Sequence, residues 1–341
     1  MSPWRTYADP PESDPSAGRE ERKATARALR DDVDFDTALA DNATGFVVWM
    51  CADALDLVDS PRGPIIDAAN VDDALPGPWE ADLLDLARRR SLTGRAVEAM
   101  AEGYQRAVAA LAMEPLHASR GEALRRSRGL AAGMEASAAQ SVTTAVRRLV
   151  SPGARLRRDR VADRWGCAAQ DSPDLGAELA QYRESLPEPS SRLLAQYRVA
   201  DALAGDAGRL LVLMSRGSDG DDVVLLEATP AHESTRESEF GAWREGSDVQ
   251  RVLLAREAVP LVPAEFAGWS TSADGMTARV WSRARAAKSL PDWGGKRARA
   301  QRLGAALGLL HASSADAASL AGYLGHSRRF ATAVRDAADR A

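Results

Sequence analysis

The stretch GFVVWMCADALDLVDSPRGPIIDAANVDDALPGPWEADLLDLARRR, residues 45–90, decides the expected fold. Its pattern predicts a strand over 45–51, a short strand over 64–67, and a helix that begins near Pro78 and Trp79. The helix has acidic residues in its first turn and arginines at its end, which is the charge order that the helix dipole favours. Acidic loops are expected between these elements, one before and one after the second strand.

Aspartates are concentrated near the ends of the two predicted strands. Carboxylates at the ends of paired strands commonly hold a cation and, with it, a phosphate group. The stretch therefore indicates a place where a site could be built. The aspartates are Asp53, Asp56, Asp59, Asp67, Asp72 and Asp73.

Composition narrows the class of protein. The chain has 341 residues, of which 45% are hydrophobic, and a formal net charge of −5. It can bury a core as one large domain or two lobes, and its charge gives no reason to expect nucleic acid or an anionic membrane as partner. Two distant cysteines, Cys51 and Cys167, favour a reducing compartment. The polar N-terminus has no signal-peptide pattern, so we expect a soluble cytoplasmic protein.

The remaining chain predicts a helical body interrupted by a small sheet. Residues 1–18 are expected to be a disordered tail, because they are rich in proline, serine and acidic residues. Residues 19–204 predict a helical lobe that contains the loops of 45–75. Residues 205–290 predict a small β-rich lobe, and residues 291–341 return to helix.

Hydrophobic periodicity places the individual elements. The fold class is therefore α+β, mostly helical, with a small antiparallel β lobe late in the chain. The predicted elements are helices over 93–113, 120–150, 182–186, 191–204 and 247–258, a hairpin of strands 208–215 and 222–228, strands over 266–271 and 276–283, and helix from 297 onward.

Two further features have ordinary structural interpretations. Residues 119–164 carry eleven arginines against four acids, but a nucleic-acid groove would want aromatic residues interleaved with them and only Trp165 is near. Solvated helix faces and pairing with the acidic loops are therefore favoured. His311 follows an apolar helical stripe, where a histidine is more often packed or on the surface than a ligand.

Five segments, in this order, resemble a bacterial family of unknown function, domain-of-unknown-function family 2252. The resemblance covers about residues 37 to 335, and LPGPWEADLLDLARR and AGYLG are its most specific pieces. The five segments are ATGFVVWMCADALDLVDS, IIDAANVDDALPGPWEADLLDLARR, EGYQRAVAALAM, RLLAQYRVAD and LAGYLG.

The resemblance implies a rearranged protein-kinase or aminoglycoside-phosphotransferase fold with two lobes. The catalytic-loop-like motif (Gly-Asp-x-His-x-x-Asn-Phe-Gly) and the metal-loop-like motif (Asn-Asp-Phe-Asp-Glu) come early, and the glycine-rich loop and strand lysine come late. Residues 205–285 would then be the nucleotide-covering lobe. The hairpin 208–228 is expected to face the loops of Asp53 and Asn70. A kinase-like label for the family is itself an inference from fold.

When the family's motifs are carried over position by position, several functional residues of the implied site are found to be replaced. Asp53 is kept where the catalytic base would stand, but Ala52, Leu55 and Val58 replace the glycine, the histidine and the metal-binding asparagine. Asn70 replaces the aspartate that would hold Mg²⁺. Its neutral amide is a weaker ligand than a carboxylate.

The implied late motifs have changed as well. The glycine-rich run is reduced to Gly205 and Gly208 around Asp206, an acid where phosphate would lie, and Leu226 replaces the strand lysine. Lys288 matches a later lysine of the family and is expected to be a structural or anion contact.

These losses predict a non-catalytic, kinase-like protein with a binding or structural role, with an unknown protein or small molecule as partner. No cofactor is expected. One alternative is an active phosphotransferase that uses Mg²⁺ and ATP, with Asp53 as base and Asp67 or Asp72 on the metal. A second alternative is a polyanion or nucleic-acid binder that uses the arginine-rich region 119–164, which the net charge disfavours.

Overall fold

The computed structural model describes residues 47–340 together with Ala24. Gaps within that range fall at 59, 61–63, 115, 133–147, 152, 166–167, 172–174, 217–221, 263, 285–286, 289–293 and 327. The predicted tail of residues 1–18 lies outside the described residues. About half of the described residues are helical, and each strand pair among them is antiparallel, so the α+β class is confirmed. No helix of the described ranges is both long and apolar enough to cross a membrane.

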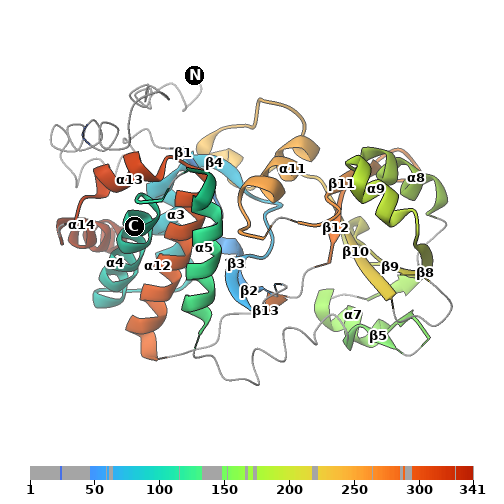
Figure 1. The fold of residues 1–341 in the computed structure, drawn as a ribbon, viewed down its shortest axis with the longest axis horizontal. Helices are drawn as coiled ribbons and strands as arrows, with labels where there is room; N and C mark the ends of the chain where they lie inside the picture. The colour runs from blue at the N-terminus through green and yellow to red at the C-terminus, as the bar shows by residue number, and fades with distance from the viewer. Residues whose placement is uncertain are drawn as a thin grey trace.

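A helical body forms one end of the molecule (Figure 1). Its centre is the pair α4 and α12, which pack closely because three glycines lie in the contact. A Cβ on Gly304 would stand 1.9 Å from the Met100 carbonyl oxygen, and one on Gly103 would stand 2.1 Å from that of Gln301. Trp79, Tyr104 and Phe330 fill the core beside this pair. The body comprises α3 (Trp79–Arg89), α4 (Arg95–Leu111), α5 (Leu116–Ala131), α12 (Gly295–Ser314), α13 (Ala317–Leu324) and α14 (Arg329–Arg340).

Two small sheets lie against this body and carry most of the acidic stretch. The two-stranded sheet pairs β1 with β4, and the three-stranded sheet has the order β13-β2-β3. The short helix η2 precedes β2. Their bounds are β1 (Val47–Met50), η2 (Ala52–Ala54), β2 (Leu55–Val58), β3 (Ile65–Ala68), β4 (Leu75–Pro78) and β13 (Ala287–Lys288).

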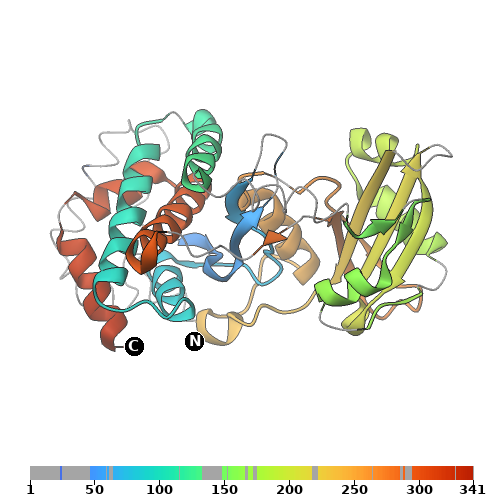
Figure 2. The same cartoon turned by 90° about the horizontal axis from the view of Figure 1, so that it is seen from below.

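A six-stranded sheet of order β11-β12-β10-β9-β8-β7 forms the other end of the molecule (Figure 2). Leu210, Val212 and Met214 of β9 pack toward α8 and α9, whereas Leu211 and Leu213 pack toward α7 and the β5–β6 pair. Burial on both faces explains why β9 is a continuous apolar run. The elements are β5 (Val150–Ser151), β6 (Arg155–Leu156), α7 (Arg158–Trp165), β7 (Gln170–Asp171), α8 (Gly176–Ser185), α9 (Glu188–Leu194), β8 (Arg198–Ala204), η3 (Asp206–Gly208), β9 (Leu210–Arg216), β10 (Asp222–Pro230), β11 (Gly268–Thr271) and β12 (Ala278–Arg283).

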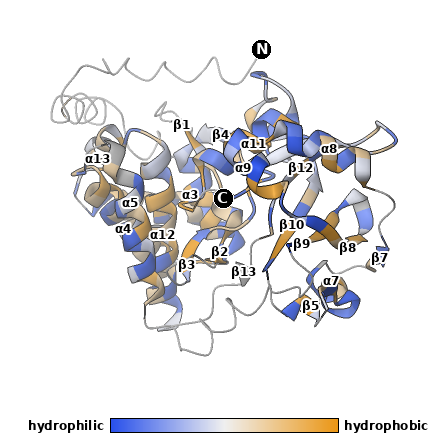
Figure 3. Ribbon diagram, turned by 45° about the vertical axis from the view of Figure 1, so that its right-hand side comes forward, coloured by the Kyte–Doolittle hydropathy of each residue, from blue (hydrophilic) through white to orange (hydrophobic). Residues whose placement is uncertain are grey.

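The chain between β10 and β11 returns to the middle of the molecule. It contains α10 (Glu237–Phe240) and α11 (Asp248–Ala258), and α11 lies between the sheet and the helical body (Figure 1). Ser247 caps α11 by accepting a hydrogen bond from the Gln250 backbone N–H, while the Gln250 side chain accepts one from Ser247 N. Apolar residues gather on α3, α12 and the strands (Figure 3).

Most predicted elements are confirmed, including the hairpin, the helix near 247–258, the strands over 266–283 and the C-terminal helices. The predicted helix over 191–204 is wrong beyond Leu194, where α9 ends, and residues 198–204 form β8, which pairs with β9. The six-stranded sheet therefore starts before the predicted lobe boundary at 205. The predicted helix 120–150 is observed to Ala131, residues 133–147 lie outside the described part, and Val150 is in a strand. The acidic loops contain two strands that were not expected, β2 and β4.

Candidate functional site

A buried carboxylate on α3, that of Asp82, holds the loop that carries Asp53. Asp82 is fully buried and accepts hydrogen bonds from the backbone N–H groups of Cys51, at 2.7 Å, and Ala52, at 3.0 Å. These N–H groups belong to the N-cap and the first residue of η2, directly after β1, and Asp82 accepts from both. The sequence predicted Asp82 only as an acidic residue in the first turn that suits the helix dipole. In the structure its carboxylate fixes the backbone conformation of the Asp53 loop.

A chain of buried side chains continues from Asp82 into the helical body. The Nε2 atom of His311 lies 3.1 Å from Asp82 Oδ2, and its Nδ1 atom lies 2.9 Å from the Tyr104 hydroxyl oxygen. Because a carboxylate only accepts, His311 donates from Nε2 to Asp82. His311 is thus a packed residue that joins α12 and α4 to the Asp53 loop.

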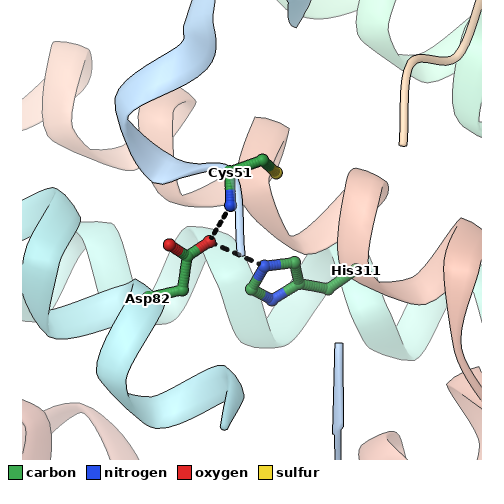
Figure 4. A group of neighbouring side chains, drawn as sticks. All are labelled: Cys51, Asp82 and His311. Atoms are coloured by element: carbon green, nitrogen blue, oxygen red, sulfur yellow. Dashed lines mark hydrogen bonds and ion pairs between the residues drawn. The ribbon is translucent and has the colours of Figure 1, made fainter. Parts of the chain in front are cut away.

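Cys51, Asp82 and His311 bring three possible metal ligand atoms within 4.8 Å of one another, all buried. Figure 4 shows that the backbone nitrogen of Cys51, not its sulfur, faces the Asp82 carboxylate. Burial, and next the Asp82 charge, raise the pKa of the Cys51 thiol well above its ordinary value, so the thiol is protonated. The Asp82 oxygens are already engaged by two backbone N–H groups and His311. These residues do not fit a metal ion.

Arg236 places a guanidinium beside Asp53. It lies 3.0 Å from Asp53, 3.4 Å from Asp82 and 3.3 Å from Asp85, and its side chain is only 6% exposed. Burial alone would lower the pKa of Arg236, but Asp82, Asp53 and Asp85 raise it above the ordinary arginine value. One buried cation of the chain therefore stands among three carboxylates of the acidic stretch.

The segment that carries Arg236 is anchored on both sides. Ser234 donates from Oγ to the Asp73 carbonyl oxygen at 2.8 Å, and the Thr235 N–H donates to the Asp73 carboxylate at 2.7 Å. Phe240 packs with Met50 and Leu75 in a small apolar cluster. Arg236 is consequently held in place by its neighbours as well as by its own ion pairs.

Asp67 and Asp72, the two predicted metal candidates, are also engaged. Asp67 is fully buried and accepts hydrogen bonds from the backbone N–H groups of Leu261 and Val262 at 2.8 and 3.2 Å. Asp72 lies 2.7 Å from Arg256 Nη2 and accepts a hydrogen bond of 2.9 Å from Thr229. Burial raises the pKa of Asp72, but the Arg256 charge and the hydrogen bonds from Arg256 and Thr229 outweigh it and lower the pKa.

A cavity of about 310 Å³ lies where the six-stranded sheet meets the loop after β3. The lining includes Asn70 from this loop and Glu227 from the hairpin, so the hairpin faces the Asn70 loop as expected. Asp53 is not in this lining and pairs with Arg236, which follows the hairpin, so the part of the expectation that concerns the Asp53 loop is not confirmed. Asn70 accepts the Asp72 N–H at 3.0 Å and so shapes the turn. The lining is Asp56, Ala68, Ala69, Asn70, Val71, Asp72, Arg164, Arg209, Glu227, Thr229, Arg256, Pro260, Ala264, Ser282 and Arg283.

Several positions implied by the resemblance do not line this cavity. Val58 is a core residue of β2, and Leu226 packs with the cluster on the α8 side of the sheet. Gly205 and Gly208 are also absent from the lining; Gly208 has φ +77° and its carbonyl oxygen accepts from Arg279 Nε at 2.8 Å. The cavity-facing residues there are Arg209 and Glu227. Leu226 therefore says nothing about the charge of the cavity, contrary to our sequence argument.

Many arginines of the region 119–164 are paired within the chain. Arg120 donates to the Glu257 carbonyl oxygen at 2.6 Å, Arg126 lies 2.5 Å from Glu122, and Arg164 lies 2.5 Å from Glu227. These partners lie on α5, α11 and β10, so pairing within the chain is observed, but the expected partners in the acidic loops are not the ones found.

Sequence reasoning missed Arg236, Arg256 and the role of Asp82. The two arginines contact carboxylates more than 180 residues away in sequence, and nothing in their local pattern marks them. A signal did exist for Asp82, since an acid in the first turn of a helix next to a loop can accept that loop's backbone N–H groups.

Comparison with known proteins identifies a family and nothing finer. The family model described as an uncharacterized protein conserved in bacteria (DUF2252) matches residues 35–341. No curated protein and no solved structure matches the chain.

Proposed function

The chain belongs to this family of uncharacterised bacterial proteins (DUF2252), and we propose that it is a non-catalytic, ligand-binding protein with a kinase-like, two-lobe arrangement. The order of its segments supports that arrangement, as does the contact between a late hairpin and an early acidic loop. In this proposal the cavity between the sheet and the β3 loop is the binding site. We also propose a cytoplasmic location, which suits the buried thiol of Cys51.

One observation carries the proposal: each carboxylate expected to do chemistry is occupied by donors of the chain itself. Asp53 pairs with Arg236, Asp72 with Arg256, and Asp67 with two backbone N–H groups. A general base needs a free carboxylate within reach of a substrate hydroxyl. In Asp53, the Oδ1 atom is instead held by the Arg236 guanidinium at 3.0 Å.

The residues present do not fit Mg²⁺ either. Mg²⁺ favours an octahedral set of oxygen ligands with one or two carboxylates, but Asp72 is committed to Arg256 and Thr229, and Asn70 accepts the Asp72 N–H. Binding the ion would require these contacts to break beside a guanidinium. The phosphotransferase alternative therefore has no support in the geometry of these ligands.

Isothermal titration with MgATP tests the proposal. We expect no binding with a dissociation constant below about 50 μM, which corresponds to about −6 kcal/mol. The Asp53→Ala variant serves as the matched control, since loss of a measurable phosphotransfer in that variant would establish catalysis. Tight MgATP binding, or phosphotransfer that depends on Asp53, would contradict the proposal.

A further inference from the structure

Most charges in the cavity cancel in pairs. Arg256 pairs with Asp72 at 2.7 Å, and Arg164 pairs with Glu227 at 2.5 Å. Arg283 lies 2.5 Å from Glu265, which is outside the lining. The two remaining charged residues of the lining are Asp56 and Arg209.

Asp56 is a half-buried acid on the wall formed by β2 and β3. It stands opposite Asp67 in the β2–β3 register, but Asp67 is capped by backbone N–H groups of residues 261 and 262. Within the described part of the chain, no hydrogen bond reaches the Asp56 carboxylate. Burial raises the pKa of Asp56, opposed by the charge of Arg90, whose Nη2 instead donates to the Leu55 carbonyl oxygen at 2.8 Å. Asp56 therefore offers a partly buried carboxylate to a further cationic group in the cavity.

Arg209 is an exposed residue that lines the same cavity from the six-stranded sheet, where it follows η3 and precedes β9. In the described ranges its side chain has no hydrogen bond or ion pair. The lining therefore offers one unengaged carboxylate on the β2–β3 side and one unengaged guanidinium on the sheet side. A guanidinium is well suited to a carboxylate or phosphate group.

We propose that the cavity binds a small zwitterion, with its ammonium group at Asp56 and its carboxylate or phosphate group at Arg209. This inference rests on the proposed ligand-binding function and names its ligand class. A ligand bound in this way spans the two walls and joins the sheet to the β2–β3 side. A volume of about 310 Å³ is at the small end for ligand sites, and a triphosphate would meet the Asp56 carboxylate with only one unengaged guanidinium.

Thermal-shift measurements on the full chain test the inference. The proteinogenic amino acids and phosphoethanolamine are added one at a time, and any compound that raises the melting temperature is titrated by calorimetry. The N-acetyl and amide derivatives of that compound follow, each of which removes one charge. We expect the zwitterion to bind and each derivative to bind at least about tenfold more weakly, the equivalent of 1.4 kcal/mol.

Two variants locate the site. Asp56→Asn and Arg209→Gln should each weaken binding at least about tenfold, whereas Arg192→Gln, a surface control on α9 with a side chain 78% exposed, should bind as the wild type does. A cooperative thermal transition of each variant without ligand shows that it folds. Absence of any zwitterion binding, or binding insensitive to N-acetylation or to both variants, overturns the inference.

The MgATP titration on the same preparation separates the two proposals. Failure of zwitterions with no MgATP binding overturns the ligand class and leaves the non-catalytic proposal standing. Tight MgATP binding overturns the proposed function, and competition between MgATP and a bound zwitterion shows whether the nucleotide takes the same cavity.

Discussion

The guanidinium of Arg236 balances the negative charges of the carboxylates at the Asp53 loop. Without its guanidinium, Asp53, Asp82 and Asp85 would face one another, and Asp82 is fully buried. Removing one partner of a buried ion pair leaves an uncompensated charge and costs about 3–5 kcal/mol. We expect Arg236→Met to lower the free energy of unfolding by this amount, measured by urea denaturation.

Asp53→Ala is the contrasting variant at the same cluster. Asp53 is 29% exposed, and Arg236 keeps Asp82 and Asp85 as partners when Asp53 is removed. Its loss should therefore cost less than about 1 kcal/mol. Equal losses in the two variants, or an Arg236→Met protein as stable as the wild type, would show that Arg236 does not balance the cluster.

At the residue scale, the sequence predicted the acids but not what neutralises them. Asp53, Asp67 and Asp72 were identified from their places at strand ends, and the structure brings one of them, Asp72, to the late hairpin, where it accepts a hydrogen bond from Thr229. The partners could not be predicted, because Arg236 and Arg256 come from a segment that crosses back from the sheet. Ion pairs made by tertiary folding leave no periodic pattern in the sequence.

At the element scale, the close packing of α4 against α12 depends on glycines. A Cβ on Gly304 would lie 1.9 Å from the Met100 carbonyl oxygen, so the helices would have to move apart. Alanine improves helix propensity by about 1 kcal/mol, but overpacking of a tight contact costs about 1–3 kcal/mol, and backbone cannot yield as a side chain can. We expect Gly304→Ala to lower the free energy of unfolding by about 1–2 kcal/mol, measured by thermal and urea denaturation.

Gly121→Ala is the matched control for helix propensity. Gly121 lies inside α5, and a Cβ there would meet nothing within 4 Å. This substitution should therefore raise the free energy of unfolding by about 0.5–1 kcal/mol. A stabilising effect of Gly304→Ala, like that of Gly121→Ala, would contradict the close-contact interpretation.

Elements with local signals could be predicted, and those defined by distant pairing could not. The helix 79–89 was found because the charges at its ends fit the dipole, and the helix 248–258 was found from its hydrophobic periodicity. The strand β8 was missed because its alanines and arginine are good helix formers, while its pairing with β9 is made by the fold. The short β2 and β4 were missed for the same reason, since each pairs across an acidic loop.

At the scale of the whole molecule, the sheet and the β2–β3 side are joined largely through α11 and the β3 loop. Arg251 is fully buried and donates to the carbonyl oxygens of Asp72 and Ala74 at 2.9 and 2.7 Å. Arg256 on the same helix pairs with Asp72, which also accepts from Thr229 at the end of β10. One acidic turn thus receives donors from α11 and from the six-stranded sheet.

This arrangement predicts that the stabilising contacts of Asp72 are lost at acidic pH. Its folded-state pKa is lowered, because Arg256 and Thr229 outweigh burial, whereas the unfolded chain should titrate near the ordinary value of 3.8. The unfolded chain therefore takes up the proton first as the pH falls. The contribution of Asp72 to stability is complete well above pH 4 and is lost as the pH falls through the lowered folded-state pKa.

Asp72→Asn separates this effect from other acids, because their titration is common to both proteins. At pH 7 the variant should lose on the order of 3 kcal/mol in free energy of unfolding, since Arg256 is left with an uncompensated buried charge. The difference between wild type and variant, measured by urea denaturation from pH 7 down to the lowest pH at which both fold, should shrink below about pH 4. A difference that stays constant with pH would show that Asp72 holds the sheet through its shape and hydrogen bonds alone, and that its charge does not join the two parts of the molecule.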